Sequence, residues 1–107
     1  MEDKLIIVHC TVPSRDEALK IARTLVDKKM AACCSLVPQV TSVYQWENKT
    51  ELSEEVLLII KTSSRVYEHL EKEIKMIHSY SVPEIIAVDI AQASSAYGDW
   101  VKQSINQ

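Results

Sequence analysis

Two long extended segments on either side of the tetrapeptide 47–50 constrain the fold more than any other feature of this chain. From residue 40 to residue 46 the first segment alternates, so that every second side chain shares a face. The tetrapeptide contains Asn48, a residue type that tolerates the left-handed backbone of a tight turn. A second extended segment returns over residues 51–61. The pattern predicts a long β-hairpin, with a bulge or an edge at Pro38 because proline cannot donate a ladder hydrogen bond.

The length of this hairpin implies a partner. A strand of about 14 residues spans roughly 45 Å, whereas a compact domain of this size has a radius of gyration of about 13 Å. We therefore expect the hairpin tip to project beyond the domain, unless the strands bend at Pro38. A projecting edge that carries Tyr44 and Trp46 promotes aggregation unless it is covered. Another copy of the same chain is the simplest cover, and a bent hairpin in a monomer is the alternative.

The remaining segments complete a βαββαβ order. Ser14 and Glu17 form the pattern of a capping box, which predicts a helix starting near Arg15. Thr62, Ser63 and Ser64 offer N-caps for a second helix, over 65–77, whose apolar residues share one face. Further strands are predicted at 4–11 and 84–92, and a last helix after Ser94 or Ser95 that contains the only glycine, Gly98. This order predicts one α+β domain over 1–107, a ferredoxin-like antiparallel sheet with two helices on one face.

The composition excludes several classes of function. The net charge is −3 and no block of Lys or Arg occurs, so we expect no nucleic-acid binding through a basic face. The acidic start and the short apolar run that follows it predict neither a signal peptide nor a membrane span. The cysteine count is odd, at 3, and the spacing matches no disulfide framework or zinc motif. Free thiols favour a reducing cytoplasm.

The run 78–88 carries the most chemistry. It places an imidazole (His78), a phenol (Tyr80) and a carboxylate (Glu84) around Pro83, directly before an apolar strand. Proline restricts its own backbone and that of the preceding residue, so the helix must end before it. Polar groups held by an ordered turn are candidates for a site, and packing at a helix–strand junction is the competing interpretation.

Several short motifs occur in a fixed order together with this turn. They are Cys10-Thr11-Val12-Pro13, Ala31-Ala32-Cys33, Ser42-Val43-Tyr44-Gln45-Trp46 with Lys49, Leu58-Ile59-Ile60-Lys61-Thr62, the turn at His78–Glu84, and Tyr97 with Trp100. That set resembles the CutA family of divalent-cation tolerance proteins, over about residues 7–100. The resemblance implies a ferredoxin-like fold and a tight homotrimer in which hairpins extend neighbouring sheets.

The resemblance also implies copper ligands. Family members use a cysteine that matches Cys10 and two consecutive histidines, of which the second matches His78 and the first is Ile77 here. Thiolate and imidazole both suit copper or zinc. We therefore expect copper binding by Cys10 and His78, at a site with one ligand fewer than in the family unless His9, Cys33 or a neighbouring subunit supplies another. A buried, non-ligating Cys10 is the alternative.

A second group of residues matches family positions around a cleft between subunits. A lysine and a carboxylate among aromatics suggest a site for a small molecule or anion, or an ion pair buried in the trimer interface. No nucleophile elbow, phosphate-binding glycine loop or HExxH motif occurs, so we expect no enzyme. The predicted function is a cytoplasmic homotrimer for divalent-cation tolerance, and the alternative is a trimeric signalling or scaffold module that binds a small anion or a protein. The cleft residues are Cys33, Tyr44, Trp46, Lys61, Tyr80, Glu84 and Trp100.

Overall fold

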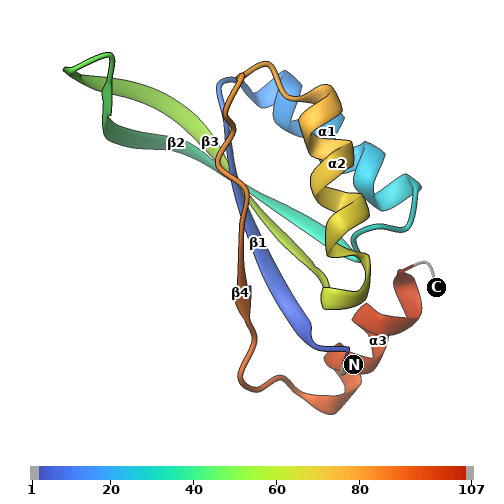
Figure 1. The fold of residues 1–107 in the computed structure, drawn as a ribbon. Coiled ribbons are helices and arrows are strands. Elements are labelled where there is room, and N and C mark those ends of the chain that lie inside the picture. Colours follow the sequence, from blue (N-terminus) through green and yellow to red (C-terminus); the bar gives the residue numbers. More distant parts are fainter. Residues whose placement is uncertain (1–2, 106–107) are drawn as a thin grey trace.

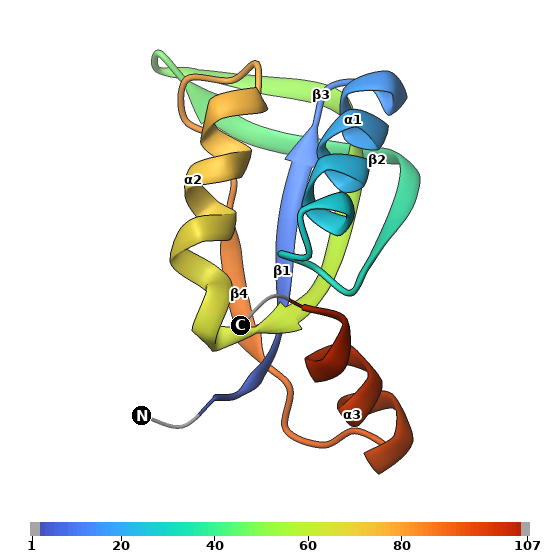
Figure 2. The same ribbon diagram turned by 90° about the vertical axis from the view of Figure 1, so that its right-hand side faces the viewer.

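A computed structural model describes residues 3–105 and confirms the ferredoxin-like prediction. The four strands form one antiparallel sheet in the order β2-β3-β1-β4. Helices α1 and α2 lie side by side across one face of this sheet, and α3 lies at the end where β1 begins (Figures 1 and 2). The elements are β1 (Leu5–Val12), α1 (Arg15–Asp27), β2 (Cys33–Trp46), β3 (Lys49–Ser63), a 3₁₀ turn (Ser64–Val66), α2 (Tyr67–Ile77), β4 (Ile86–Asp89) and α3 (Ser95–Ser104).

The core lies between the sheet and the two helices. Alternate residues of β1, such as Ile6, Val8 and Cys10, are buried on the helix side, as the two-residue period of a strand requires. Leu25 of α1 and Leu70 of α2 are fully buried against them. Complete burial of one such aliphatic side chain contributes about 1.5–3 kcal/mol, so this cluster stabilises the packing of both helices on the sheet.

The hairpin forms as predicted. Trp46 pairs with Lys49, and the two residues between them, Glu47 and Asn48, have φ of 51° and 65°. A two-residue loop with positive φ at both positions is the turn whose twist matches that of the flanking strands. The ladder shifts register between Val37 and Val40, which places the expected bulge at Pro38. The hairpin extends well beyond the helices, in a molecule of 44 × 26 × 25 Å (Figure 1).

Two predicted boundaries were wrong. The second helix begins as a 3₁₀ turn, and no side chain caps either it or α2. The hydroxyl of Thr62 donates to the carbonyl of Met30 instead, and Ser64 Oγ accepts from the amide of Lys4. The last strand covers only Ile86–Asp89 rather than 84–92, because the preceding segment turns toward the hairpin.

The last helix forms despite its glycine. A Cβ atom on Gly98 would lie 3.2 Å from Leu5 Cδ1, and the residue is buried. Glycine therefore permits α3 to approach β1 closely, which outweighs its low helix propensity. None of the helices in the described residues is long and apolar enough to cross a membrane.

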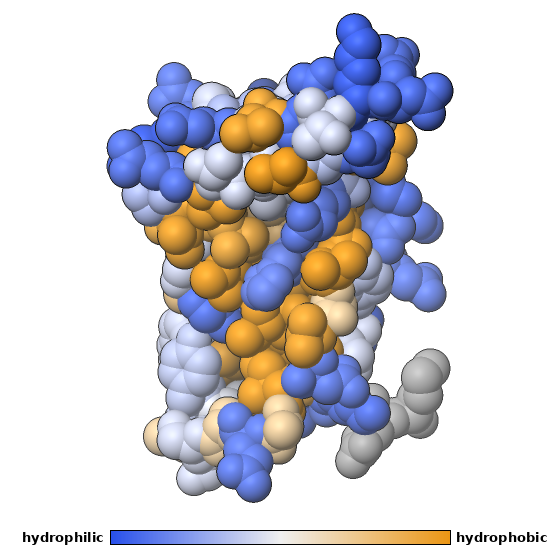
Figure 3. Space-filling view, turned by 90° about the vertical axis from the view of Figure 1, so that its left-hand side faces the viewer, coloured by the Kyte–Doolittle hydropathy of each residue, from blue (hydrophilic) through white to orange (hydrophobic). Residues whose placement is uncertain are grey.

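The sheet face opposite α1 and α2 carries an apolar band. Ile7 pairs with Val88, and His9 lies between Ile86 and Ile59, so these side chains share that face. Ile86 and Val88 are each 51% exposed. Figure 3 shows this face, where hydrophobic side chains run down the middle of the sheet. We call the set Ile7, Leu57, Ile59, Ile86 and Val88 the open sheet face.

Candidate functional site

A cleft of about 720 Å³ lies between the hairpin and the loop that follows α2. The hairpin brings aromatic side chains to one wall, because alternate residues of β2 point the same way. The loop and the end of β1 form the other wall. The cleft is lined by Thr11, Ser42, Val43, Tyr44, Trp46, Glu55, Ser79, Tyr80, Ser81, Val82 and Glu84.

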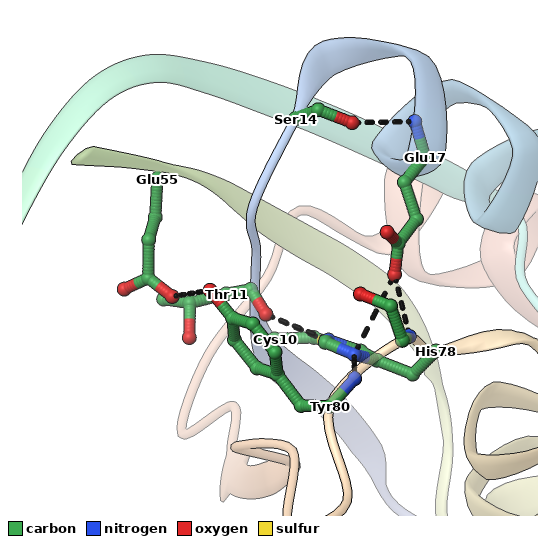
Figure 4. A network of polar contacts seen from close by, with 8 residues as sticks. Cys10, Thr11, Ser14, Glu17, Glu55, His78 and Tyr80 are labelled. Carbon is green, nitrogen blue, oxygen red and sulfur yellow. Dashed lines mark hydrogen bonds and ion pairs between the residues drawn. The ribbon is translucent and has the colours of Figure 1, made fainter. Parts of the chain in front are cut away.

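A partly buried hydrogen bond joins the loop to β3 at the cleft. The Tyr80 hydroxyl donates to Glu55 Oε2 over 2.8 Å, and the Glu55 residue is only 7% exposed (Figure 4). Burial and the neighbouring Glu55 carboxylate raise the pKa of Tyr80 above its ordinary value of 10.0. Tyr80 therefore keeps its proton and acts as a donor, which fixes the loop against the hairpin.

His78 shapes the same loop from the helix side. Its Nε2 lies 2.8 Å from the carbonyl oxygen of Thr11, and its Nδ1 accepts from the amide of Tyr80 over 3.1 Å (Figure 4). These partners require the proton on Nε2. His78 is thus a buried connector between α2, β1 and the loop, and both of its ring nitrogens have partners.

Glu17 supports the loop as well. Its Oε2 accepts from the amide of Ser79 over 2.8 Å and lies 3.6 Å from His78 Nδ1. The Ser14 hydroxyl accepts from the amide of Glu17, so half of the predicted capping box forms. The other half is absent from the contacts of the described residues, because the carboxylate of Glu17 is turned to the loop (Figure 4). The pattern at 14–17 therefore predicted the helix start but missed this second role.

Cys10 and His78 lie close to each other, since His78 contacts the residue next to Cys10. They do not fit a copper ion in this arrangement. The Cys10 side chain is buried in the core, and burial together with the charges of Glu84 and Glu17 raises the pKa of its thiol to about 12. The thiol is then protonated at neutral pH, and His78 has no free lone pair. Ile77, at the position of the family's other histidine, packs against the core, and residues 3–105 contain no group of three His, Cys, Asp or Glu side chains placed for a metal.

The residues predicted around one cleft form separate groups within a single copy. Tyr44, Trp46, Tyr80 and Glu84 do line the cleft. Cys33 lies opposite Lys61 on the ladder, at the other end of the hairpin. There the Lys61 ammonium donates to Ser35 Oγ over 2.6 Å and lies 3.9 Å from Cys33 Sγ. Trp100 packs against Tyr97 on α3, with ring centroids 5.6 Å apart.

The charge of the cleft differs from the predicted lysine–carboxylate pair. Its lining contains two carboxylates, Glu55 and Glu84, and no Lys, Arg or His side chain. Sequence reasoning missed Glu55, which stands at the start of the apolar half of β3. Glu55 pairs with Val40, which lies on the same face of β2 as Tyr44 and Trp46. An acidic residue on this aromatic face was the only sequence feature that could have pointed to Glu55. Within one copy, this lining suits a cation better than an anion.

Comparison with known proteins agrees with the fold and the motifs. The profile of the family described as CutA1 divalent ion tolerance protein matches residues 6–104. The divalent-cation tolerance protein CutA of Thermus thermophilus is 39% identical over 98 residues, which cover 92% of this chain and 95% of that protein. The chloroplastic protein CutA of Arabidopsis thaliana is 43% identical over 92% of this chain, which spans 54% of that relative's length.

Solved structures give the same result. The structure of the Thermus thermophilus divalent cation tolerance protein superimposes with a TM-score of 0.94 at 37% identity, covering 95% of this chain and 99% of that one. CutA1 from Oryza sativa gives a TM-score of 0.95 at 38% identity, with 97% and 95% covered. The sequence match covers nearly the whole chain and the fold agrees throughout. The chain therefore belongs to the CutA1 divalent ion tolerance protein family.

Proposed function

We propose that this chain forms a non-enzymatic homotrimer that contributes to divalent-cation tolerance in the cytoplasm. The names of its relatives support the tolerance role. All three cysteines are free thiols, which fits a reducing compartment. We infer the trimer from the open sheet face, which is apolar and lies next to a projecting hairpin.

Assembly with further copies of the chain would cover the open sheet face. Val88 and Ile86 are half exposed on a sheet whose other face is already covered by helices (Figures 1 and 2). A second and third copy would bury the face and close the exposed strand edges by symmetry. In such an assembly we propose that Lys61 of one copy pairs with Glu84 of the next, since neither forms an ion pair within residues 3–105 of one copy.

Light scattering with size-exclusion chromatography tests the assembly. We expect a species of three times the chain mass of 12.1 kDa, and we expect Val88→Asp to dissociate it by placing a charge on the open sheet face. Lys72→Asp, at an exposed position of α2, is the matched control and should remain trimeric. A wild-type monomer that stays folded at nanomolar concentration contradicts the proposal.

We propose that the tolerance role does not depend on copper bound by Cys10 and His78, because the Cys10 side chain is buried in the core and both ring nitrogens of His78 have hydrogen-bond partners. A copper(I) competition titration under reducing conditions compares the wild type with the Cys10→Ser/His78→Ala variant. We expect equal affinities, provided that light scattering shows both proteins to be intact trimers. Tight stoichiometric binding that the double variant loses would overturn this conclusion.

The tolerance role itself requires a growth assay. The chain is expressed in a bacterium that lacks its own family member, and growth is measured against rising copper concentration. We expect the wild type and Cys10→Ser/His78→Ala to restore growth, and Val88→Asp to fail. No difference between the wild type and an empty vector would refute the proposed role.

A further inference from the structure

We propose that the cleft binds a small organic cation of the alkylammonium type, held by the Glu55 carboxylate and by the aromatic side chains of Tyr44, Trp46 and Tyr80. This site goes beyond the proposed role in divalent-cation tolerance and does not depend on it. Two features support it: an unbalanced buried charge and an aromatic wall.

The Glu55 carboxylate is the first feature. Glu55 is 7% exposed, yet it takes part in no ion pair within residues 3–105. Its one side-chain hydrogen bond comes from the neutral Tyr80 hydroxyl to Oε2. A hydrogen bond from a neutral donor stabilises a buried carboxylate but does not balance its charge. A cation that enters the cleft would supply that balance.

The aromatic wall is the second feature. Tyr44 and Trp46 lie two residues apart on the same face of β2, and Tyr80 faces them from the loop. In a single copy, Tyr44 and Trp46 are 41% and 53% exposed. Aromatic rings attract cations through the negative charge of their faces, and groups of rings recognise alkylammonium ions in this way. The combination of a carboxylate and several rings is typical of sites for organic cations.

A divalent metal fits this cleft less well. The lining offers only two carboxylates, Glu55 and Glu84, and the described residues contain no cluster of three metal-binding side chains. Hard divalent cations bind oxygen ligands in a defined geometry and gain nothing from aromatic rings, whereas an alkylammonium ion needs no fixed coordination geometry and is attracted by the faces of the rings. If Lys61 of a neighbouring copy pairs with Glu84, the charge of Glu55 still remains for the ligand.

Tetramethylammonium is the probe, because tert-butanol has nearly the same size and shape without the charge. Binding is followed in the trimer by nuclear magnetic resonance of the two tryptophan indole N–H groups, at constant ionic strength set with sodium chloride. Trp46 lines the cleft and Trp100 does not, so each protein carries its own reference signal. We expect a saturable shift of the Trp46 signal with tetramethylammonium, a much smaller one with tert-butanol, and none at Trp100.

Glu55→Gln removes the charge and keeps an oxygen that accepts from Tyr80. We expect at least a tenfold loss of tetramethylammonium affinity in this variant. Glu54→Gln is the matched control, because Glu54 is exposed and faces the other side of β3, opposite Thr41. Its affinity should equal that of the wild type.

Tyr44→Leu gives an independent test if Glu55→Gln does not fold. It removes one ring of the aromatic wall, at an exposed position. We expect a severalfold loss of affinity. The proposal is overturned if tert-butanol binds as tightly as tetramethylammonium, or if Glu55→Gln and Tyr44→Leu both bind like the wild type. It is also overturned if wild-type Trp46 shows no saturable shift, which would mean that the neighbouring copy already fills the cleft.

Discussion

Replacement of Tyr80 by phenylalanine removes one oxygen atom from the molecule and leaves the Glu55 carboxylate without its hydrogen-bond donor. The bond is 2.8 Å long, and its acceptor is a carboxylate on a residue that is 7% exposed. Hydrogen bonds to charged groups contribute about 1.5–3 kcal/mol, against about 0.5–1.5 kcal/mol for neutral pairs. We therefore expect Tyr80→Phe to lower the free energy of unfolding by about 1.5–3 kcal/mol.

A double-mutant cycle separates this bond from other effects of the substitution. In a Glu55→Gln background the acceptor is neutral, so Tyr80→Phe should cost only about 0.5–1.5 kcal/mol. The difference between the two costs, about 1–1.5 kcal/mol, is the contribution of the charge. Tyr44→Phe is the control, because its hydroxyl bonds to Ser53 at an exposed position and should change stability by less than about 0.5 kcal/mol.

Urea denaturation at equal protomer concentration measures these differences, since the stability of a trimer depends on concentration. Equal costs of Tyr80→Phe in the wild-type and Glu55→Gln backgrounds would refute the reasoning, because they would mean that the carboxylate gains nothing from the phenol. A loss no larger than that of Tyr44→Phe would refute it as well.

The remaining predictions concern pH, the turn, the loop and the thiols. Because the pKa of Tyr80 is raised in the folded protein, its contribution is complete below the ordinary value of about 10 and is lost as the pH rises further; urea midpoints should therefore fall more steeply for the wild type than for Tyr80→Phe. Glu47→Asn should raise the free energy of unfolding by about 0.5–1 kcal/mol, because asparagine adopts positive φ more readily; an unchanged urea midpoint counts against the turn geometry. Glu17→Ala should lower it by about 1–2 kcal/mol through loss of the Ser79 contact, and Glu17→Gln by less. Burial raises the thiol pKa of Cys10 and of Cys34 to about 12, so iodoacetamide at pH 8 should label both only after unfolding, as mass spectrometry would show.

The hairpin was predictable because its signals are local. The alternation after Val40, the proline at 38 and the asparagine at 48 each act on backbone geometry within a few residues. The structure confirms all three, including the bulge and the two positive φ values. The start of the second helix was missed for the opposite reason, since the hydroxyls of Thr62 and Ser64 bond to residues far away in the sequence.

The site was only partly predictable because its contacts join distant segments. Tyr80, Glu84, Tyr44 and Trp46 came from motifs and do line one cleft. Glu55 could not be chosen among 15 acidic residues, because its importance depends on burial by a loop 25 positions away. Lys61 lies opposite Cys33 at the other end of the hairpin and does not line the cleft of the same copy.

His78 shows how one residue type supports two interpretations until its partners are known. Beside Cys10, an imidazole is a plausible copper ligand by chemistry alone. In the structure its Nε2 instead hydrogen-bonds to the carbonyl of Thr11, and its Nδ1 accepts from the amide of Tyr80. The Glu17 carboxylate accepts from the amide of Ser79. These three contacts fix the loop that carries Tyr80 to Glu55. The imidazole therefore positions one wall of the cleft without lining the cleft itself.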